Sequence, residues 1–304
     1  MKTETGKDLI KSKGMREKTK RNISGWLFLI PSVALLYFIV WRPAIYGGYL
    51  SFFDLKGFTP SGFVGLKNYK IVLSHTDFIK TLRNTGFYVM WSVIIGFLPP
   101  LILALMINEM KRFTGFAKFA LYAPSMLPSI VVSMLWYYMY YPDASGLLNM
   151  VAGWFGASPQ AWLQDSRMVI PCIIISMTWN CMGGTMLMYL AALQGVNRDL
   201  YEAALIDGAG IFKRIFKIAL PELQGVMLLF FCKQIIGVFQ IMEQPMAMTG
   251  GGPNGASLTL GLQIYRYAFV YGKAGNSLAL GMFVFVLLSF MSVLYSALDK
   301  KINE

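Results

Sequence analysis

Long apolar runs separated by short polar segments dominate the chain. Six of these runs reach about 20 residues, the length of helix that crosses a hydrocarbon core roughly 30 Å thick. They lie at 26–49, 86–107, 116–141, 168–193, 225–245 and 278–298. Each run must be helical, because a segment in lipid has to satisfy its own backbone N–H and C=O groups. The pattern therefore predicts an all-α integral membrane protein with six transmembrane helices.

Composition agrees with this class. The 304 residues include 56% hydrophobic and only 14% charged side chains, and the mean hydropathy is +0.53. Charged residues approach a quarter of the total in soluble domains, so a soluble globular protein is excluded.

The basic residues set the predicted orientation. With both termini inside, 17 of the 27 Lys and Arg residues fall in inner segments and nine in outer ones, while Lys233 lies within the fifth run. Lys and Arg concentrate on the cytoplasmic side of membrane proteins, so this bias favours an N-in and C-in topology. The net charge of +12 is then explained by topology and by attraction to anionic lipid headgroups, and nucleic acid is not an expected partner.

One membrane domain flanked by two short tails is expected. Residues 1–25 form a basic cytoplasmic tail, residues 26–298 the six-helix domain, and residues 299–304 a cytoplasmic C-terminal tail. The first apolar run is too long for the core of a signal peptide and has no small-x-small cleavage site after it. It is therefore expected to stay as an anchor.

Motifs for catalysis are missing from the sequence. It contains no G-x-x-x-x-G-K-[ST], G-x-S-x-G or H-E-x-x-H motif, so the chain is not expected to be an enzyme or to hydrolyse ATP by itself. Cys172, Cys181 and Cys232 lie in apolar runs, and the one histidine, His75, lies in a polar loop. These residues are expected to pack or to face solvent, and neither a metal site nor a cofactor is predicted.

A polar stretch at 200–223, LYEAALIDGAGIFKRIFKIALPEL, separates the fourth and fifth runs. It predicts a short helix, a tight turn at Gly208 and Gly210, and a second, amphipathic helix that Pro221 interrupts. The apolar side of the second helix lies opposite its basic residues, which are Lys213, Arg214 and Lys217. In isolation this pattern is also typical of a helix that anchors at the membrane interface.

The order of residues in this stretch resembles the EAA loop of the permease subunits of binding-protein-dependent ABC importers. The matching residues are Glu202-Ala203-Ala204, Asp207-Gly208-Ala209 and Leu220-Pro221. Other segments are similar, in the same order, to the carbohydrate branch of that family and to its maltose-type first permeases: FVGLKNY (63–69), APSMLPSIVVSMLW (123–136), YPDASGLLN (141–149), AALQGVNRDLYEAA (191–204) and MTGGGPNG (248–255). The resemblance covers roughly 26–298 and implies the ABC type I importer permease fold.

In that family the EAA loop docks into a groove on the ATPase subunit. The resemblance implies this coupling role for residues 195–222, carried by Glu202, Ala203, Ala204, Asp207, Gly208, Ala209 and Pro221. Small residues allow the loop to seat deeply, and the Glu202 carboxylate can pair with a donor in the groove. The implied partners are a second permease subunit in a heterodimer, two ATP-binding cassette subunits, an extracytoplasmic solute-binding protein, a sugar and membrane lipid. The implied location is the bacterial cell membrane.

Two further segments are candidate sites, the first in an outer loop and the second within the third run. Residues 249–257 are too polar and flexible to span a membrane; they form either a plain connector or, by resemblance, a loop that contacts the binding protein through Gly250, Gly251, Gly252 and Pro253. In the third run, Pro124 and Pro128 free backbone carbonyls and predict a kink, which either serves packing or lines a gate.

Polar residues in the fifth run are candidates for the substrate pathway. Lys233, Gly237, Gln240 and Gln244 recur at the spacing of one helical face, and Glu243 beside them is a candidate partner for Lys233. Polar groups at membrane depth usually face water or each other, and glutamine amides suit sugar hydroxyls. Trp179, Asn180 and Gly184 of the fourth run are the remaining pathway candidates. Contacts that hold helices together explain the same residues equally well.

The transported solute remains open at this stage. The Arg42-Pro43 pair and the charge of Lys233 both depart from the family pattern. An importer of the same fold for a glycerol phosphodiester or another polar organic solute is the alternative. A secondary transporter would need ion-coupling groups in the membrane and no EAA-type loop, and a membrane scaffold would show no substrate-stimulated ATP hydrolysis.

Overall fold

The computed structural model describes residues 22, 25–110 and 112–303, so most of the predicted basic tail at 1–25 lies outside the described residues. The elements up to the fourth span are η1 (Tyr37–Trp41), α2 (Arg42–Leu50), β1 (Phe53–Lys56), β2 (Thr59–Phe63), α3 (Lys67–Ser74), α4 (Thr76–Trp91), η2 (Ser92–Phe97), α5 (Leu98–Glu109), α6 (Thr114–Tyr122), η3 (Ala123–Met126), α7 (Ser129–Met139), α8 (Leu147–Trp154), η4 (Trp162–Gln164) and α9 (Val169–Leu193). They are followed by α10 (Arg198–Ile206), α11 (Ile211–Arg214), η5 (Ile215–Ala219), α12 (Leu220–Glu222), α13 (Gln224–Phe239), α14 (Glu243–Thr249), α15 (Leu260–Tyr265), η6 (Arg266–Val270) and α16 (Ala274–Asn303).

Helices long and apolar enough to cross a membrane form the frame of the described chain. By length and composition there are four, Gly25–Leu50, Thr76–Glu109, Val169–Leu193 and Ala274–Ala297. Two bent pairs also qualify when each is counted as one span, with a bend of 95° between α6–η3 and α7 and of 70° between α11–α12 and α13. The fourth predicted span therefore agrees with α9 to within one residue, whereas the second helix begins at Thr76, ten residues before its apolar run.

The predicted proline kink in the third run is confirmed, and it is a complete break. Leu127 adopts an extended conformation between η3 and α7, and Pro128 caps α7. The Asn180 side chain of α9 donates a 2.7 Å hydrogen bond to the carbonyl of Pro124, and the Ser125 hydroxyl donates to the carbonyl of Asn180 at 2.5 Å. A neighbouring helix thus satisfies a carbonyl group freed by the break, as buried backbone in a membrane requires.

One predicted boundary is wrong, and one element was not predicted. The fifth helix, α13, ends at Phe239, and Gln244 belongs to the separate helix α14. The last span ends at Ala297, one residue from the predicted end, while the helix α16 itself continues to Asn303. The all-α prediction also missed a hairpin in which Lys56 pairs with Thr59; its turn contains Gly57, which adopts the positive φ of 62° that glycine accommodates best.

The fourth span lies at the centre of the packing. α9 contacts α4, α5, α6, α7 and η2, and its residues enter two apolar clusters. One cluster joins α9 to α5 and to the end of the polar stretch through Leu193, Leu105 and Ala219. The approach to α6 is close enough to require glycine, because a Cβ at Gly183 would lie 2.2 Å from the carbonyl oxygen of Leu121.

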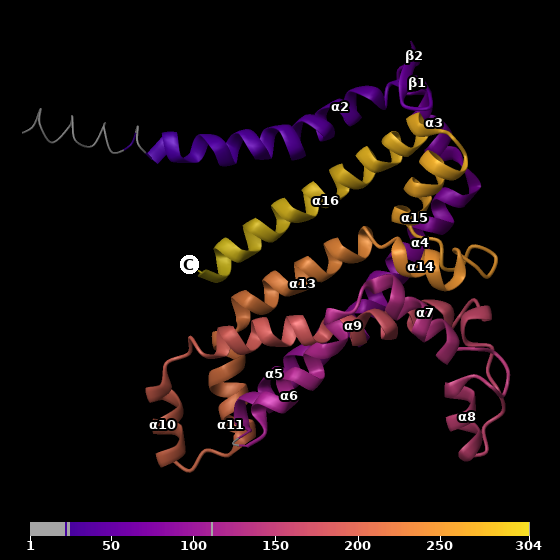
Figure 1. Ribbon diagram of the computed structural model, residues 1–304. Helices are drawn as coiled ribbons and strands as arrows, with labels where there is room; N and C mark the ends of the chain where they lie inside the picture. Colours follow the sequence, from indigo (N-terminus) through magenta and orange to yellow (C-terminus); the bar gives the residue numbers. More distant parts are fainter. Residues whose placement is uncertain (1–21, 23–24, 111, 304) are drawn as a thin grey trace, which may run out of the picture.

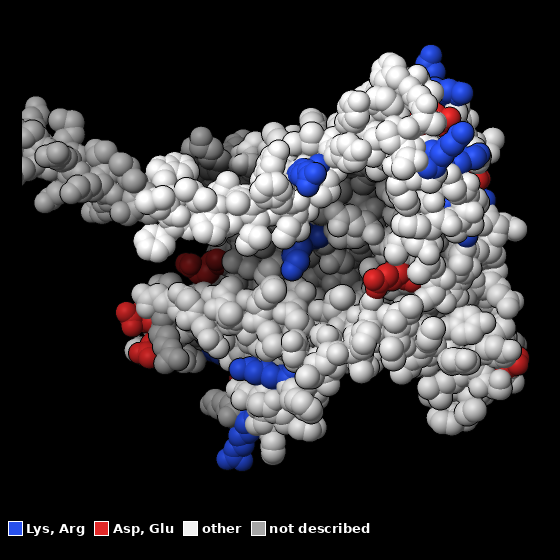
Figure 2. Space-filling view, turned by 45° about the horizontal axis from the view of Figure 1, so that its top comes forward, with Lys and Arg blue, Asp and Glu red and all other residues white. Residues whose placement is uncertain are grey.

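Different elements form the two ends of the molecule. Figure 1 shows α10, α11 and the C-terminal end of α16 on one side, and the β1–β2 hairpin, α7 and α8 on the opposite side. The first helix, Gly25–Leu50, packs little against the rest of the chain, since no residue of its apolar 18-residue segment is buried. In the space-filling view the molecule is hollowed between an upper arm and a lower body, and Lys and Arg side chains gather at the upper right (Figure 2).

Candidate functional site

The polar stretch at 195–222 folds as two helices joined by a tight turn. Asn197 caps α10 by accepting a 2.9 Å hydrogen bond from the N–H of Asp199, and the carboxylate of Asp199 suits the positive end of that helix. Pro221 does not end the second helix, since the chain stays helical to Glu222 after a π-helical turn in η5. The chain bends into α13 at Leu223, the residue after the end of α12 at Glu222.

The turn is a Schellman motif. The N–H of Ala209 donates to the carbonyl of Ala204 at 2.8 Å, and the N–H of Gly208 donates to Leu205 at 3.1 Å. Gly208 has a φ of 69°, the left-handed conformation that this motif needs. The space around the Gly208 Cβ position is open within this chain. The turn therefore projects a small, rigid corner outward.

The predicted coupling residues lie mainly on the surface. Glu202, Ala203, Asp207, Gly208 and Pro221 are exposed, Ala204 is half-buried and Ala209 is buried. Large apolar side chains accompany them, with Ile206 87%, Phe212 78% and Phe216 63% exposed. An apolar surface with a carboxylate at its edge is suited to docking against another protein. We call the segment from Arg198 to Glu222 the coupling segment.

Arg214 of the coupling segment does not point to solvent with Lys213 and Lys217, contrary to the prediction. Its guanidinium lies 2.5 Å from the Glu109 carboxylate, and it also donates a 3.0 Å hydrogen bond to the carbonyl of Ala209. Arg214 lies one helical turn from Ile218, at the edge of the face that buries Ala219, so its position is compatible with burial. No local pattern identifies Glu109 as its partner.

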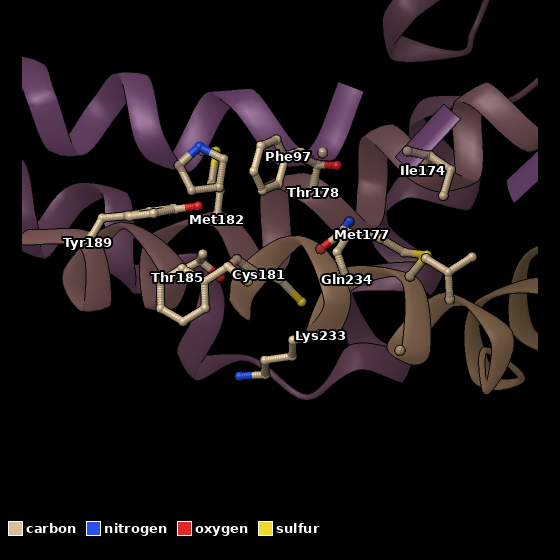
Figure 3. A pocket seen from close by; sticks show the side chains of 15 residues that line it. Phe97, Ile174, Met177, Thr178, Cys181, Met182, Thr185, Tyr189, Lys233 and Gln234 are labelled. Carbon is tan, nitrogen blue, oxygen red and sulfur yellow. The ribbon is translucent and has the colours of Figure 1, made fainter. Parts of the chain in front are cut away.

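The predicted pathway residues of the fifth run divide between two cavities. Lys233 and Gly237 line a cavity of about 270 Å³ between α5, α9 and α13. Figure 3 shows Thr178, Cys181 and Gln234 around this cavity, with Lys233 at its edge and its nitrogen turned away from them. Thr178 and Gln234 are polar lining residues that the sequence did not single out. Within the described chain the ion pair between a Lys or Arg and a carboxylate is Arg214–Glu109, so Lys233 is not paired with Glu243.

The second cavity, of about 380 Å³, contains the other three candidates, Gln240, Glu243 and Gln244. The single helical face predicted for 233–244 is wrong, because α13 ends before Gln240. The freed carbonyl of Ile241 accepts a 2.6 Å hydrogen bond from the Thr259 hydroxyl. Glu243 accepts a hydrogen bond from the Ser129 hydroxyl of α7.

Two of the three fourth-span candidates, Asn180 and Trp179, contact the broken third span. Asn180 is 8% exposed and its amide binds Pro124. The ring of Trp179 lies edge-on to that of Trp136, with centroids 6.0 Å apart. Gly184 is half-buried, with open space around its Cβ position. Other residues of α9 line the first cavity, and no residue of α9 lines the second.

Hydrogen bonds join the loop at 249–257 to other elements of the described chain. Gly250 and Gly251 adopt positive φ values of 56° and 85°. The carbonyl of Gly250 accepts from Arg266, and that of Gly252 accepts a 2.6 Å hydrogen bond from the Ser257 hydroxyl. The half-buried Pro253 follows Gly252 directly. We call this segment the outer loop.

The part of the chain described by the structure contains no group of three or more His, Cys, Asp or Glu side chains arranged to hold a metal ion.

Comparison with family models identifies the type of protein. Residues 96–304 match the family described as "Binding-protein-dependent transport system inner membrane component". The chain belongs to this family. The match begins at the end of η2 and includes α5, α9, the coupling segment, α13 and the outer loop. The helix Gly25–Leu50, the hairpin, α3 and α4 lie before it.

Relatives and solved structures extend the match to nearly the whole permease. The lactose transport system permease protein LacF of Rhizobium radiobacter is 31% identical over 94% of this chain and 98% of its own length. The trehalose/maltose transport system permease protein MalF of Thermococcus litoralis is 30% identical over 89% of this chain and 92% of its own. A crystal structure of a bacterial alginate ABC transporter, in complex with an alginate pentasaccharide-bound periplasmic protein, contains a chain that superposes with a TM-score of 0.81. It covers 95% of this chain and 98% of that one at 22% identity, which establishes the ABC type I importer permease fold.

Proposed function

We propose that this permease is one of two membrane subunits of an ABC importer that moves a sugar or oligosaccharide into the cell. The observation that carries this function is the coupling segment, which presents a rigid turn and an exposed apolar surface at one end of a helical membrane domain. The choice of solute rests on relatives whose names state lactose and trehalose/maltose transport. The subunit is proposed to form a heterodimer with a second permease and to bind two ATPase subunits and a solute-binding protein.

The proposed topology has six spans with both termini inside. Each bent pair then counts as one span, which brings the four long helices to six. The position of α10, α11 and the end of α16 on the same side of the molecule supports this arrangement (Figure 1). The hairpin, α8 and the outer loop are then extracytoplasmic, and the domain lies in the bacterial cell membrane.

We expect ATP hydrolysis to require the partner subunits. The purified permease in liposomes should hydrolyse no ATP, because its sequence holds no phosphate-binding loop. Addition of the two ATPase subunits and the second permease should produce hydrolysis and uptake of a labelled sugar delivered by the loaded binding protein. Turnover by the isolated chain at stoichiometric levels, or ATP-independent uptake driven by an ion gradient, would contradict the proposal.

The two cavities are proposed to border the substrate pathway. Lys233 and Gly237 belong to one, and Gln240, Glu243 and Gln244 to the other. Exposed polar groups at membrane depth are costly unless they meet water or a polar solute. Trp179 and Asn180 are proposed to act indirectly, by holding α9 against the broken third span, whereas Gly184 has open space around its Cβ position and is not proposed to hold that contact.

Lys233 offers the sharpest test of this pathway. We expect Lys233→Met to lower sugar uptake about tenfold, since the variant removes the cation at the edge of the cavity while keeping the length of the side chain. Lys233→Arg, which keeps the charge, should retain most uptake. Initial rates in proteoliposomes, normalised to the amount of assembled complex, provide the measurement. Equal uptake by both variants would place the pathway on other helices or mainly in the partner permease.

The outer loop, with Gly250, Gly251, Gly252 and Pro253, is proposed to contact the binding protein. Basic side chains flank the outer loop. Lys80 donates a hydrogen bond to the carbonyl of Asn254. Exposed basic residues also lie on the hairpin, on α3 and on α4: Lys56, Lys67, Lys70 and Arg83. The hairpin, α3 and α4 form the region at the upper right of Figure 2, where Lys and Arg side chains gather. Such a surface attracts an acidic face of a partner over a Debye length of roughly 8 Å at physiological salt.

Charge reversal on α3 tests this contact. The double variant Lys67→Glu/Lys70→Glu should weaken activation of ATP hydrolysis by the loaded binding protein about fivefold at low salt, because rim charges mainly set the association rate. High salt should reduce the difference. Arg167→Glu, an exposed cation just before α9 and far from α3 in sequence, is the matched control. Equal losses in both variants would speak against a localised contact.

A further inference from the structure

The helix Thr76–Glu109 is attached by polar contacts at both of its ends. At the inner end, the Glu109 carboxylate and the Arg214 guanidinium form an ion pair of 2.5 Å, with 19% and 11% of the two side chains exposed. Glu109 is the last residue of α5, where a carboxylate opposes the negative end of the helix dipole. The Arg214 guanidinium offsets this unfavourable placement, because it pairs directly with the Glu109 carboxylate.

Arg214 extends the contact from α5 to the turn of the coupling segment. One guanidinium nitrogen binds Glu109 while the other donates to the carbonyl of Ala209, directly after Gly208. The planar fork of arginine holds two acceptors at fixed geometry, which a lysine ammonium on its flexible stem does less well. The corner formed by the Schellman motif is therefore fixed relative to the end of α5.

The first helix of the coupling segment also closes over this pair. Tyr201 of α10 packs against the apolar cluster shared by α5 and α9. Burial raises the pKa of its phenol, the Glu109 carboxylate raises it further, and Arg214 opposes the change. The phenol thus stays neutral beside the ion pair, and α5, α10 and α11 meet at one point.

The outer end of the same helix is attached to the outer loop. The Asn84 side chain, 4% exposed, donates to the carbonyls of Gly255 at 2.8 Å and Leu258 at 3.1 Å. One turn further along α4, the Tyr88 hydroxyl donates to Ser257 at 3.2 Å. Lys80, one turn before Asn84, donates to Asn254. The three side chains recur at i, i+4 and i+8, so one face of α4 binds the loop.

We propose that the helix Thr76–Glu109 transmits the state of the outer loop to the coupling segment, with Asn84 and Arg214 as positioning residues at its two ends. This inference rests on the proposed function, in which the binding protein contacts one end and the ATPase subunits the other. Short polar contacts at both ends let a displacement of either end move the other. Linkage then requires that ATP binding changes the affinity for the loaded binding protein by the same factor as the binding protein changes the affinity for ATP.

The test compares ATP hydrolysis with and without loaded binding protein in the complete reconstituted complex. Arg214→Gln should reduce the stimulation at least tenfold while the ATPase subunits still copurify in normal amounts. Arg214→Lys should give an intermediate value, because a single ammonium replaces two fixed donors. Arg112→Gln removes the same charge from an exposed position outside the coupling segment, and it should leave the stimulation unchanged.

A double variant tests whether both ends act through one element. Asn84→Ala should lower the stimulation by itself, and Asn84→Ala/Arg214→Gln should be no worse than the more severe single variant. Independent losses that multiply, normal stimulation in Arg214→Gln, or loss of the ATPase subunits from that variant would each overturn the proposal. A wild-type complex without any stimulation would instead contradict the proposed function, so the two failures are distinguishable.

Discussion

Substitution of Gly183 by valine should prevent the permease from folding stably in the membrane. A Cβ at this position would lie 2.2 Å from the carbonyl oxygen of Leu121 and 2.7 Å from the Cα of Tyr122. Both atoms are backbone, so a change of side-chain rotamer cannot relieve the clash. Overpacking of well-packed sites costs about 1–3 kcal/mol, and a clash with backbone falls at the upper end or beyond. The fraction of monodisperse protein after detergent extraction and its melting temperature measure the effect.

The neighbouring glycine supplies a matched control. Gly184 lies on the same helix and has open space around its Cβ position, so Gly184→Val should change the melting temperature by a few degrees at most. Gly183→Ala should lie between Gly183→Val and wild type. Similar melting temperatures for the two valine variants would show that α6 and α9 are less closely packed than the geometry requires.

Sugar uptake should be abolished by Gly208→Leu, although the permease itself folds. The φ of 69° makes any L-residue costly here, by about 1–2 kcal/mol. Alanine and leucine share this cost, whereas only leucine extends well beyond the corner into the space where the ATPase subunit is proposed to dock. We therefore expect Gly208→Ala to keep measurable uptake and Gly208→Leu to lose at least tenfold more.

Copurification of the ATPase subunits separates the two contributions in this experiment. Gly208→Leu should lose these subunits or their coupling to transport, with membrane levels of the permease near those of wild type. Gly210→Ala is the control, because Gly210 has an ordinary φ of −64° and open surroundings. Equal uptake in Gly208→Ala and Gly208→Leu would mean that backbone strain alone matters and that no partner seats on the corner.

Local sequence information was sufficient for the fourth span and for the turn of the coupling segment. The apolar run at 168–193 predicts α9 because it is continuous and long enough to be one helix. The turn at Gly208 was predictable because glycine is the residue that most easily adopts a positive φ after a helix. Both features depend on residues close together in the chain.

The end of α13 depends on residues that are distant in sequence. Hydropathy extends the fifth run to Pro245, whereas the helix stops at Phe239. The carbonyl of Ile241 is satisfied by Thr259, and Gly261 allows close approach, since a Cβ there would lie 2.7 Å from the same oxygen. A break in a membrane helix is tolerated where other segments satisfy its backbone, and a one-dimensional pattern does not contain that information.

The orientation of Arg214 is a second feature that the sequence alone does not predict. Its position on the helix was compatible with burial, but a charged residue in an amphipathic helix is ordinarily assigned to solvent. The partner that makes burial acceptable, Glu109, lies 105 positions away. Buried charges require such partners, so the inward orientation could be recognised only once α5 and α11 were brought together.

The continuity of the helix Thr76–Glu109 gives it the geometry of a lever. Its 34 residues correspond to a length of about 51 Å at the usual rise per residue. If the outer end is the pivot, a tilt of about 5° displaces the inner end by about 4 Å over that length. A movement of this size exceeds the tolerance of a hydrogen bond, so a small rotation beside the outer loop is enough to reposition the corner at Gly208.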